Sequence, residues 1–239
     1  MTRKKADGLD GSFRAWKEKI RALLKSPDFS EDTLRASCLP LMKGINALFP
    51  FLYHGDEEVH RRAVVAIGTL VADLADRDMD RARNVVRRLM WNLNDESGGI
   101  GWGSPEAMGE ILARHEGLAG EYACVLASYT REEGNYLENE VLQRGLLWGI
   151  GRVLRHWPDL IHRAEPSISP YLASGDPCVR GLAAGLLGEL GDGLAGSDLE
   201  GLLEDRAEYR IPMTENPVVR RVQDEAKEAT RKLDSGGGI

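Results

Sequence analysis

The sequence predicts an all-α superhelix of about five stacked helix pairs, with an extra N-terminal helix as a cap. Apolar residues recur at helical spacing along most of the chain, for example at Phe13, Trp16, Ile20, Leu23 and Leu24. A glycine-containing segment recurs at intervals near 40 residues, a period typical of arrays of helix pairs. A good helix-capping residue stands 12 positions before the aligned glycine in each full copy.

The recurring segment is clearest in two copies, residues 56–74 and 176–190. Aligning Gly68 with Gly188 also aligns Asp56 with Asp176, Val59 with Val179, Ala63 with Ala183 and Leu70 with Leu190. Gly109 and Gly151 extend the series, and successive glycines are 41, 42 and 37 residues apart. A fifth copy begins at residue 216 and has Glu228 at the glycine position. The expected helix caps are Asp56, Ser97, Asn139, Asp176 and Asn216, with Ser104 as the better cap in the second copy.

The segment from Tyr171 to Leu190 resembles the HEAT-repeat family, including its HEAT-like (PBS-lyase-type) members. In that family the pattern Asp-x-x-Val-Arg-x-x-Ala-x-x-x-Leu-Gly-x-Leu forms the turn and the second helix, and residues 176–190 match it throughout. The resemblance covers roughly residues 38–233. The family arginine is present at Arg180 and Arg220, but the other copies have His60, Gly101 and Gln143 there. The resemblance implies an α-α solenoid, and most HEAT arrays bind proteins.

The expected organisation has three parts. Residues 1–37 form a mobile N-terminus and capping helices, residues 38–233 the repeat array, and residues 234–239 a flexible glycine-rich tail. Each repeat begins with a first helix, near 38–53, 78–93, 118–131, 159–173 and 198–206. Residues 209–215 are expected to form a longer loop before the last helix. The small residues at Gly68, Gly109, Gly151 and Gly188 are expected where a neighbouring helix comes close.

Composition excludes several classes of function. A net charge of −7 and a pI near 5.4 argue against general nucleic-acid binding, which needs a basic face. No apolar run is long enough to span a membrane, and the N-terminus lacks the apolar stretch of a signal peptide. The three cysteines, Cys38, Cys124 and Cys178, lie far apart and are expected to be buried free thiols in a reducing, cytoplasmic compartment. No metal-binding spacing occurs, so we expect no metal and no cofactor.

The most unusual stretch is residues 90–112. Three glycines lie between Trp91 and Trp102, and a fourth, Gly103, follows Trp102. Ser104-Pro105-Glu106 comes next as a helix start, in which an acidic residue suits the positive end of the helix. Backbone N–H groups of such a loop can contact a bound group. The alternative is an irregular turn between repeats that packs Trp102 into the core. The residues leave both interpretations open.

Residues 135–148 occupy the corresponding place in the next repeat. Because equivalent positions of adjacent repeats line up, the two segments 94–106 and 135–148 are expected to form one contact surface. Its candidate binding residues are Trp91, Asn94, Asp95, Glu96, Gly99, Trp102, Ser104, Glu106, Tyr136, Glu138, Asn139, Gln143 and Arg144. Carboxylates gathered in this way can bind a metal or carry out acid–base chemistry. A solvated acidic face at helix N-termini is the favoured interpretation of them.

The leading functional hypothesis is a non-catalytic protein-interaction module, without catalytic residues and with another protein as its partner. The alternative is a HEAT-like enzyme that acts on a bound macromolecule, similar to alkylated-DNA glycosylases or to bilin lyases. The DNA-acting version needs a basic concave face and a catalytic carboxylate, for which Trp102 and Asp95 are the candidates. The acidic balance of the chain counts against it.

Overall fold

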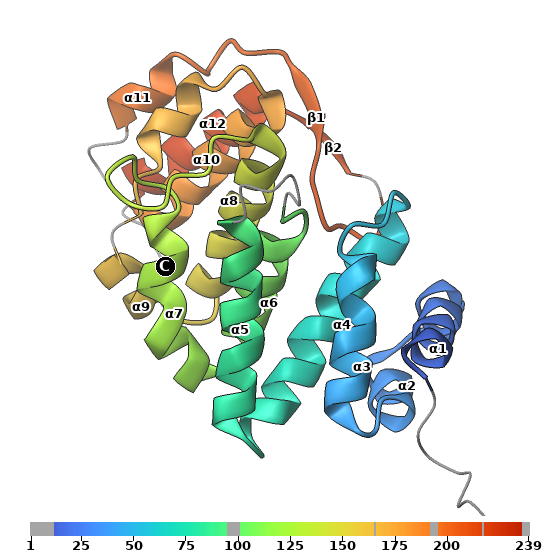
Figure 1. Ribbon diagram of the computed structural model, residues 1–239. Coiled ribbons are helices and arrows are strands. Elements are labelled where there is room, and N and C mark those ends of the chain that lie inside the picture. Colours follow the sequence, from blue (N-terminus) through green and yellow to red (C-terminus); the bar gives the residue numbers. More distant parts are fainter. Residues whose placement is uncertain (1–11, 95–100, 165, 192–195, 217, 236–239) are drawn as a thin grey trace, which may run out of the picture.

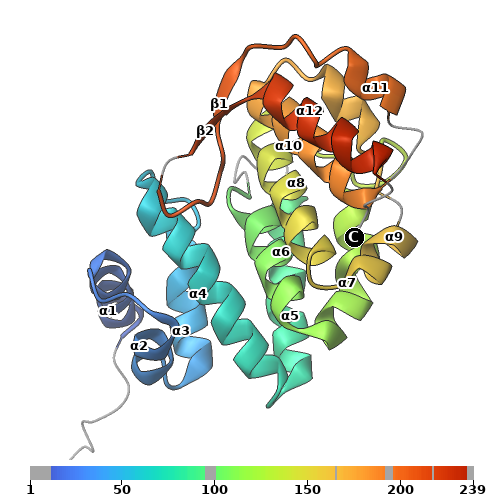
Figure 2. The ribbon, with the colours of Figure 1, turned by 180° about the vertical axis from the view of Figure 1, so that it is seen from behind.

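The fold is built on a row of five inner helices that stack in sequence order. The computed structural model describes residues 12–94, 101–164, 166–191, 196–216 and 218–235. The inner helices are α4 (Glu57–Ala75), α6 (Ser104–Arg114), α8 (Glu140–Leu154), α10 (Pro177–Leu190) and α12 (Val222–Asp234). Each packs against the next along the row, as Figure 2 shows. The predicted all-α superhelix is confirmed.

Outer elements precede the inner helices along the chain. They are α3 (Leu41–Leu48) with the 3-10 helix η1 (Phe49–Phe51), α5 (Met79–Leu93), α7 (Glu116–Ser128), α9 (Pro158–Ala164) with η2 (Ser169–Ala173), and α11 (Gly196–Glu200). Two additional helices, α1 (Phe13–Lys25) and α2 (Glu31–Ser37), lie at the N-terminal end beside α3 and α4 (Figure 1). The expected mobile N-terminus and tail fall largely on residues 1–11 and 236–239, outside the described residues.

Three of the five expected caps begin an inner helix. The carboxylate of Asp56 accepts hydrogen bonds from the N–H groups of Glu58 and Val59, at 3.0 and 3.1 Å. Asp176 caps α10 in the same way, and the side chain of Asn139 caps α8. Ser97 lies outside the described residues, and the expectation of Ser104 as the better cap was wrong, because Gly103 is the N-cap of α6 and Ser104 is its first residue. Satisfying these N–H groups fixes where each helix starts.

The prediction that Asn216 caps the fifth inner helix was wrong. Residues Val219–Arg221 form strand β2, which pairs antiparallel with β1 (Glu208–Arg210), and α12 begins only at Val222. The expected loop 209–215 therefore begins inside a hairpin. Consecutive β-branched residues at 218 and 219 favour an extended backbone. The pairing also gives the backbone N–H and C=O groups of both segments partners.

The inner helices approach each other closely at glycines. A Cβ atom added at Gly109 would lie 2.3 Å from the Cα of Gly149, and one at Gly188 would lie 2.6 Å from the Cα of Ala229. Neither position has room for a side chain. The expected contact at Gly151 was wrong, since its nearest neighbour is the Arg155 side chain of its own helix, and Gly149 provides the contact instead.

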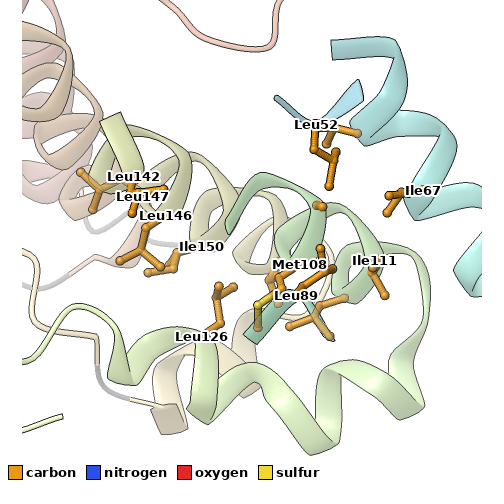
Figure 3. Close-up of a cluster of buried hydrophobic side chains, with 14 of the residues drawn as sticks. Leu52, Ile67, Leu89, Met108, Ile111, Leu126, Leu142, Leu146, Leu147 and Ile150 are labelled. Atoms are coloured by element: carbon orange, nitrogen blue, oxygen red, sulfur yellow. The ribbon is translucent and has the colours of Figure 1, made fainter. Parts of the chain in front are cut away.

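One hydrophobic core runs through the stack from repeat to repeat. Figure 3 shows part of it, where Leu52 and Ile67 of the first repeat, Met108 and Ile111 of the second, and Leu146 and Ile150 of the third form a continuous cluster. Such continuity is expected because each helix pair leaves an apolar face that only its neighbour covers.

Two of the three cysteines are buried. Cys38 and Cys178 are free and buried, as predicted, whereas Cys124 is exposed. The prediction for Cys124 was wrong because α7 buries the face that carries Leu118, Tyr122 and Leu126, and residue 124 lies on another face. Over the described part of the chain, no helix combines the length and apolarity needed to cross a bilayer.

Candidate functional site

The N-terminal ends of α4, α6, α8 and α10 lie in one row, and the β1–β2 hairpin and its loop cross over them (Figures 1 and 2). Two ion pairs join the hairpin segment to α4, Arg210 to Glu57 at 4.0 Å and Glu215 to Arg61 at 3.7 Å. Beneath the segment lies a cavity of about 680 Å³, which we call the hairpin cavity. Its lining comes from α4 (57, 58, 60, 61), α6 (106), α8 (141, 144), α10 (176–178) and residues 208–215. Elements of four repeats thus meet in one site.

Glu106 and Asp176 are the two buried acids of this cavity, and Glu106 is the one without a cation among the described residues. Its side chain is only 8% exposed, and its Oε2 atom has no hydrogen-bond partner. No described cation lies within 4 Å of its carboxyl group. Burial raises the pKa of Glu106 to about 7, because the charged form loses hydration without gaining a countercharge. The favoured expectation of a solvated acidic face was therefore wrong for this residue.

Two glycines place the Glu106 side chain. Gly103 has φ of +73°, a left-handed conformation, and a Cβ atom there would lie 2.6 Å from the carbonyl oxygen of Leu52. This turn directs the chain into α6, and Glu106 follows in the first turn of the helix. On α8, a Cβ atom at Gly145 would lie 2.4 Å from both carboxyl oxygens of Glu106. The carboxyl group thus occupies the space that a side chain at residue 145 would fill.

The cations on the cavity wall contact other acids. The Nε atom of Arg144 donates to Asp176 at 2.9 Å, and Arg61 donates two hydrogen bonds of 2.8 Å to Glu58. The lining contains six carboxyl groups, those of Glu57, Glu58, Glu106, Asp176, Glu208 and Glu215, against the guanidinium groups of Arg61, Arg144 and Arg210. The wall is therefore net acidic.

The histidine, cysteine and tyrosine side chains of the hairpin cavity are neutral near pH 7. Burial lowers the pKa of His60, whose Nδ1 atom lies 3.0 Å from the carbonyl oxygen of Leu52. Burial raises the pKa of the Cys178 thiol to about 12 and also raises the pKa of Tyr209. A thiol with that pKa is a poor nucleophile. Among the residues that the structure describes, no three His, Cys, Asp or Glu side chains are grouped as a metal site.

A second hollow lies between the segments before α6 and before α8. It measures about 850 Å³ and is lined by residues 92–94, 101, 132, 134–139 and 142; we call it the Tyr136 hollow. Val141 lines the hairpin cavity and Leu142, the next residue of α8, lines the Tyr136 hollow. The segments before α6 and before α8 both contribute to this hollow, which is the neighbourhood that the repeat alignment predicts.

The structure separates the predicted binding residues into groups. Asn94, Tyr136, Glu138 and Asn139 line the Tyr136 hollow, and Glu106 and Arg144 line the hairpin cavity. Gln143 and Ser104 are buried, and Trp102 is half-buried against the core. Trp91 is 75% exposed and lines neither site. Asp95, Glu96 and Gly99 lie outside the described residues.

The sequence interpretation missed the hairpin residues 208–215, because no repeat motif points to them. Asp176 was identified only as a cap, although its second carboxyl oxygen binds Arg144. One available signal was Gly145, a glycine inside a predicted helix. Because glycine disfavours a helix interior, its presence there indicates that another group approaches the helix closely.

Comparisons with known proteins support the fold. No family model matches the chain. An uncharacterised protein of Archaeoglobus fulgidus is 32% identical over 109 residues, 44% of this chain, and the match spans about half (51%) of that relative. The structure is similar to that of an engineered protein, with a TM-score of 0.54, 17% identity and coverage of 94% and 98% of the two chains. It is also similar to a designed armadillo repeat protein in complex with the peptide (KR)4, with a TM-score of 0.51, 16% identity and coverage of 91% and 99%. The chain has the armadillo/HEAT-like helical repeat fold.

Proposed function

We propose that this chain is a non-catalytic interaction scaffold that binds a segment of another protein. The contact surface comprises residues 101–106 and 135–148 with Asn94, and it extends under the hairpin segment. The observation that carries the proposal is that the first turn of α8 lines both sites, with Val141 in the hairpin cavity and Leu142 in the Tyr136 hollow. Helical repeat proteins use such continuous surfaces across successive repeats to bind extended partners.

The charge of the surface favours a protein partner with basic residues. Six carboxyl groups against three guanidinium groups line the hairpin cavity, and such a wall repels the phosphates of a nucleic acid. A designed armadillo repeat protein of similar fold is in complex with the peptide (KR)4, which shows that this architecture accommodates a basic segment in that protein. Partially exposed aromatic groups are frequent anchors of binding surfaces, and Tyr136 in the hollow is 36% exposed.

The test is affinity capture from the native host, followed by titration of the purified partner. Tyr136→Ala should weaken binding about tenfold or more while the melting temperature changes little. Phe13→Ala, which removes an exposed aromatic side chain on α1, is the matched control and should bind like the wild type. Equal affinity of the wild type and Tyr136→Ala, or absence of any saturable partner, contradicts the proposal.

One observation favours the enzyme alternative. A carboxyl group with a pKa near 7 is suited to general acid–base catalysis, and Glu106 is such a group. A HEAT-like enzyme would use it as the proton donor or acceptor for a bound macromolecule. Release of bases from alkylated DNA by the wild type, lost in Glu106→Gln, would support this alternative over a scaffold.

A further inference from the structure

We propose that the hairpin cavity is a receptor for a lysine side chain of the bound protein segment, with the carboxyl group of Glu106 as the acceptor for the lysine ammonium group. This inference rests on the proposed function and specifies the chemistry of the partner. It starts from the one buried acid of the cavity that lacks a cation, whereas the arginine side chains of the cavity contact other acids.

The cavity wall matches both ends of a lysine side chain. Apolar groups of Val141, Pro177, Ile211, Pro212 and Met213 line the cavity and can cover the aliphatic part of the side chain. The net acidic wall attracts the ammonium group during approach.

The geometry of the carboxyl group favours lysine over arginine. The group is packed against the backbone of Gly145, and its Oε2 atom is buried. A guanidinium group binds best to a carboxylate that offers both oxygens in one plane. An ammonium group is a compact charge that needs only one accessible acceptor, so it fits a carboxyl group with one oxygen covered.

The occupant is a side chain of an extended segment, because the first turn of α8 lines the Tyr136 hollow as well as the hairpin cavity. A chain with one residue beside Val141 in the hairpin cavity can follow α8 to Leu142 in that hollow. The hairpin segment lies over the other side, attached to α4 through Arg210 and Glu215.

Binding of an ammonium group should displace the proton of Glu106. Near pH 7 about half of the empty sites carry this proton, since the pKa is about 7, and a neighbouring cation favours the ionised form. The other titratable or charged groups around the cavity are Glu57, Glu58, His60, Arg61, Arg144, Asp176, Cys178, Glu208, Tyr209, Arg210 and Glu215. Proton release that depends on Glu106 therefore distinguishes this site from general attraction to acidic groups.

The experiment uses the full chain and three end-blocked peptides, (Lys-Ala)4, (Arg-Ala)4 and (acetyl-Lys-Ala)4. Isothermal titration calorimetry at pH 7 in two buffers of different ionisation enthalpy gives the affinity and the number of protons released. We expect the lysine peptide to bind at least tenfold more tightly than the other two and to release about half a proton. Glu106→Gln should weaken it at least tenfold and abolish the release. Glu133→Gln, which removes an exposed acid outside both cavities, should behave as the wild type.

Several outcomes overturn the inference. They are no binding of (Lys-Ala)4, equal binding of the acetylated peptide by the wild type, and unchanged affinity or proton release in Glu106→Gln. The acetylated peptide tests the charge on the wild type alone, so the result does not depend on the folding of any variant. If butylammonium binds as tightly as the lysine peptide, the cavity is a site for a free amine, and the proposal that a protein segment occupies it is refuted. If the captured partner still requires Tyr136 in those cases, the proposed scaffold function stands and only the lysine assignment fails.

Discussion

The pH dependence of stability should change when Glu106 is replaced by glutamine. The pKa of Glu106 rises from an ordinary value of 4.5 to about 7 on folding, so the folded state binds this proton more tightly than the unfolded chain. Proton binding by Glu106 therefore stabilises the folded state at low pH, where Glu106 is protonated. This stabilisation is lost as the pH rises through 7 and Glu106 ionises. At 1.36 kcal/mol per pKa unit, the full difference is roughly 3 kcal/mol, of which about 2–3 kcal/mol falls between pH 5 and 8.

Glu106→Gln keeps the shape of the side chain and removes its titration. Urea unfolding of the wild type and the variant at pH 5, 6, 7 and 8 gives two profiles whose difference isolates this one group, since the other titrating residues are common to both. The wild type should lose about 2–3 kcal/mol relative to the variant over this range. The exposed-acid control Glu133→Gln should follow the wild type. A constant difference between wild type and Glu106→Gln from pH 5 to pH 8 would refute the claim that Glu106 is buried without a countercharge.

Two further predictions concern packing and buried charge, and urea unfolding measures both. Gly109→Ala should cost about 1–3 kcal/mol, because the new Cβ atom would lie 2.3 Å from the Cα of Gly149, whereas Gly120→Ala, with no neighbour within 4 Å on helix α7, should stabilise by up to ~1 kcal/mol. Equal effects at the two glycines would remove the close-contact argument. Glu110→Ala should cost about 3–5 kcal/mol, because Glu110 is 2% exposed and accepts from two arginines, whereas Asp80→Ala in an exposed ion pair should cost below ~1 kcal/mol. A small effect at Glu110 would mean that its pairs are dispensable.

The repeat architecture could be predicted from the sequence because it depends on local, periodic features. A cap such as Asp56 and a glycine twelve residues later act within one helix or between adjacent helices, so the same pattern recurs in each copy. The prediction failed at Asn216, where the cap chemistry was present but the following residues pair with β1 instead. Strand pairing joins segments that no repeat period relates, so the pattern gave no sign of it.

The candidate site was only partly predictable, for a related reason. The alignment indicated that the segments before α6 and α8 are neighbours, and both line the Tyr136 hollow. Whether Glu106 is solvated or buried depends on the adjacent turn at Gly103 and on two features distant in sequence, the missing side chain at Gly145 and the hairpin segment. In the sequence, an acid in the first turn of a helix is ordinary, and its burial follows only from tertiary structure.

A comparison within α6 supports the binding interpretation of Glu106. Glu110, one turn further along the same helix, is also buried, but Arg114 and Arg152 donate to it at 2.7 and 2.8 Å. The repeat stack thus pairs the buried carboxylate of Glu110 with two arginines, and these pairs stabilise the fold. At Glu106 the nearby cation, Arg144, binds Asp176 instead. Since an unpaired buried carboxylate costs free energy, its place at the wall of a cavity is best explained by a cation that arrives with a partner.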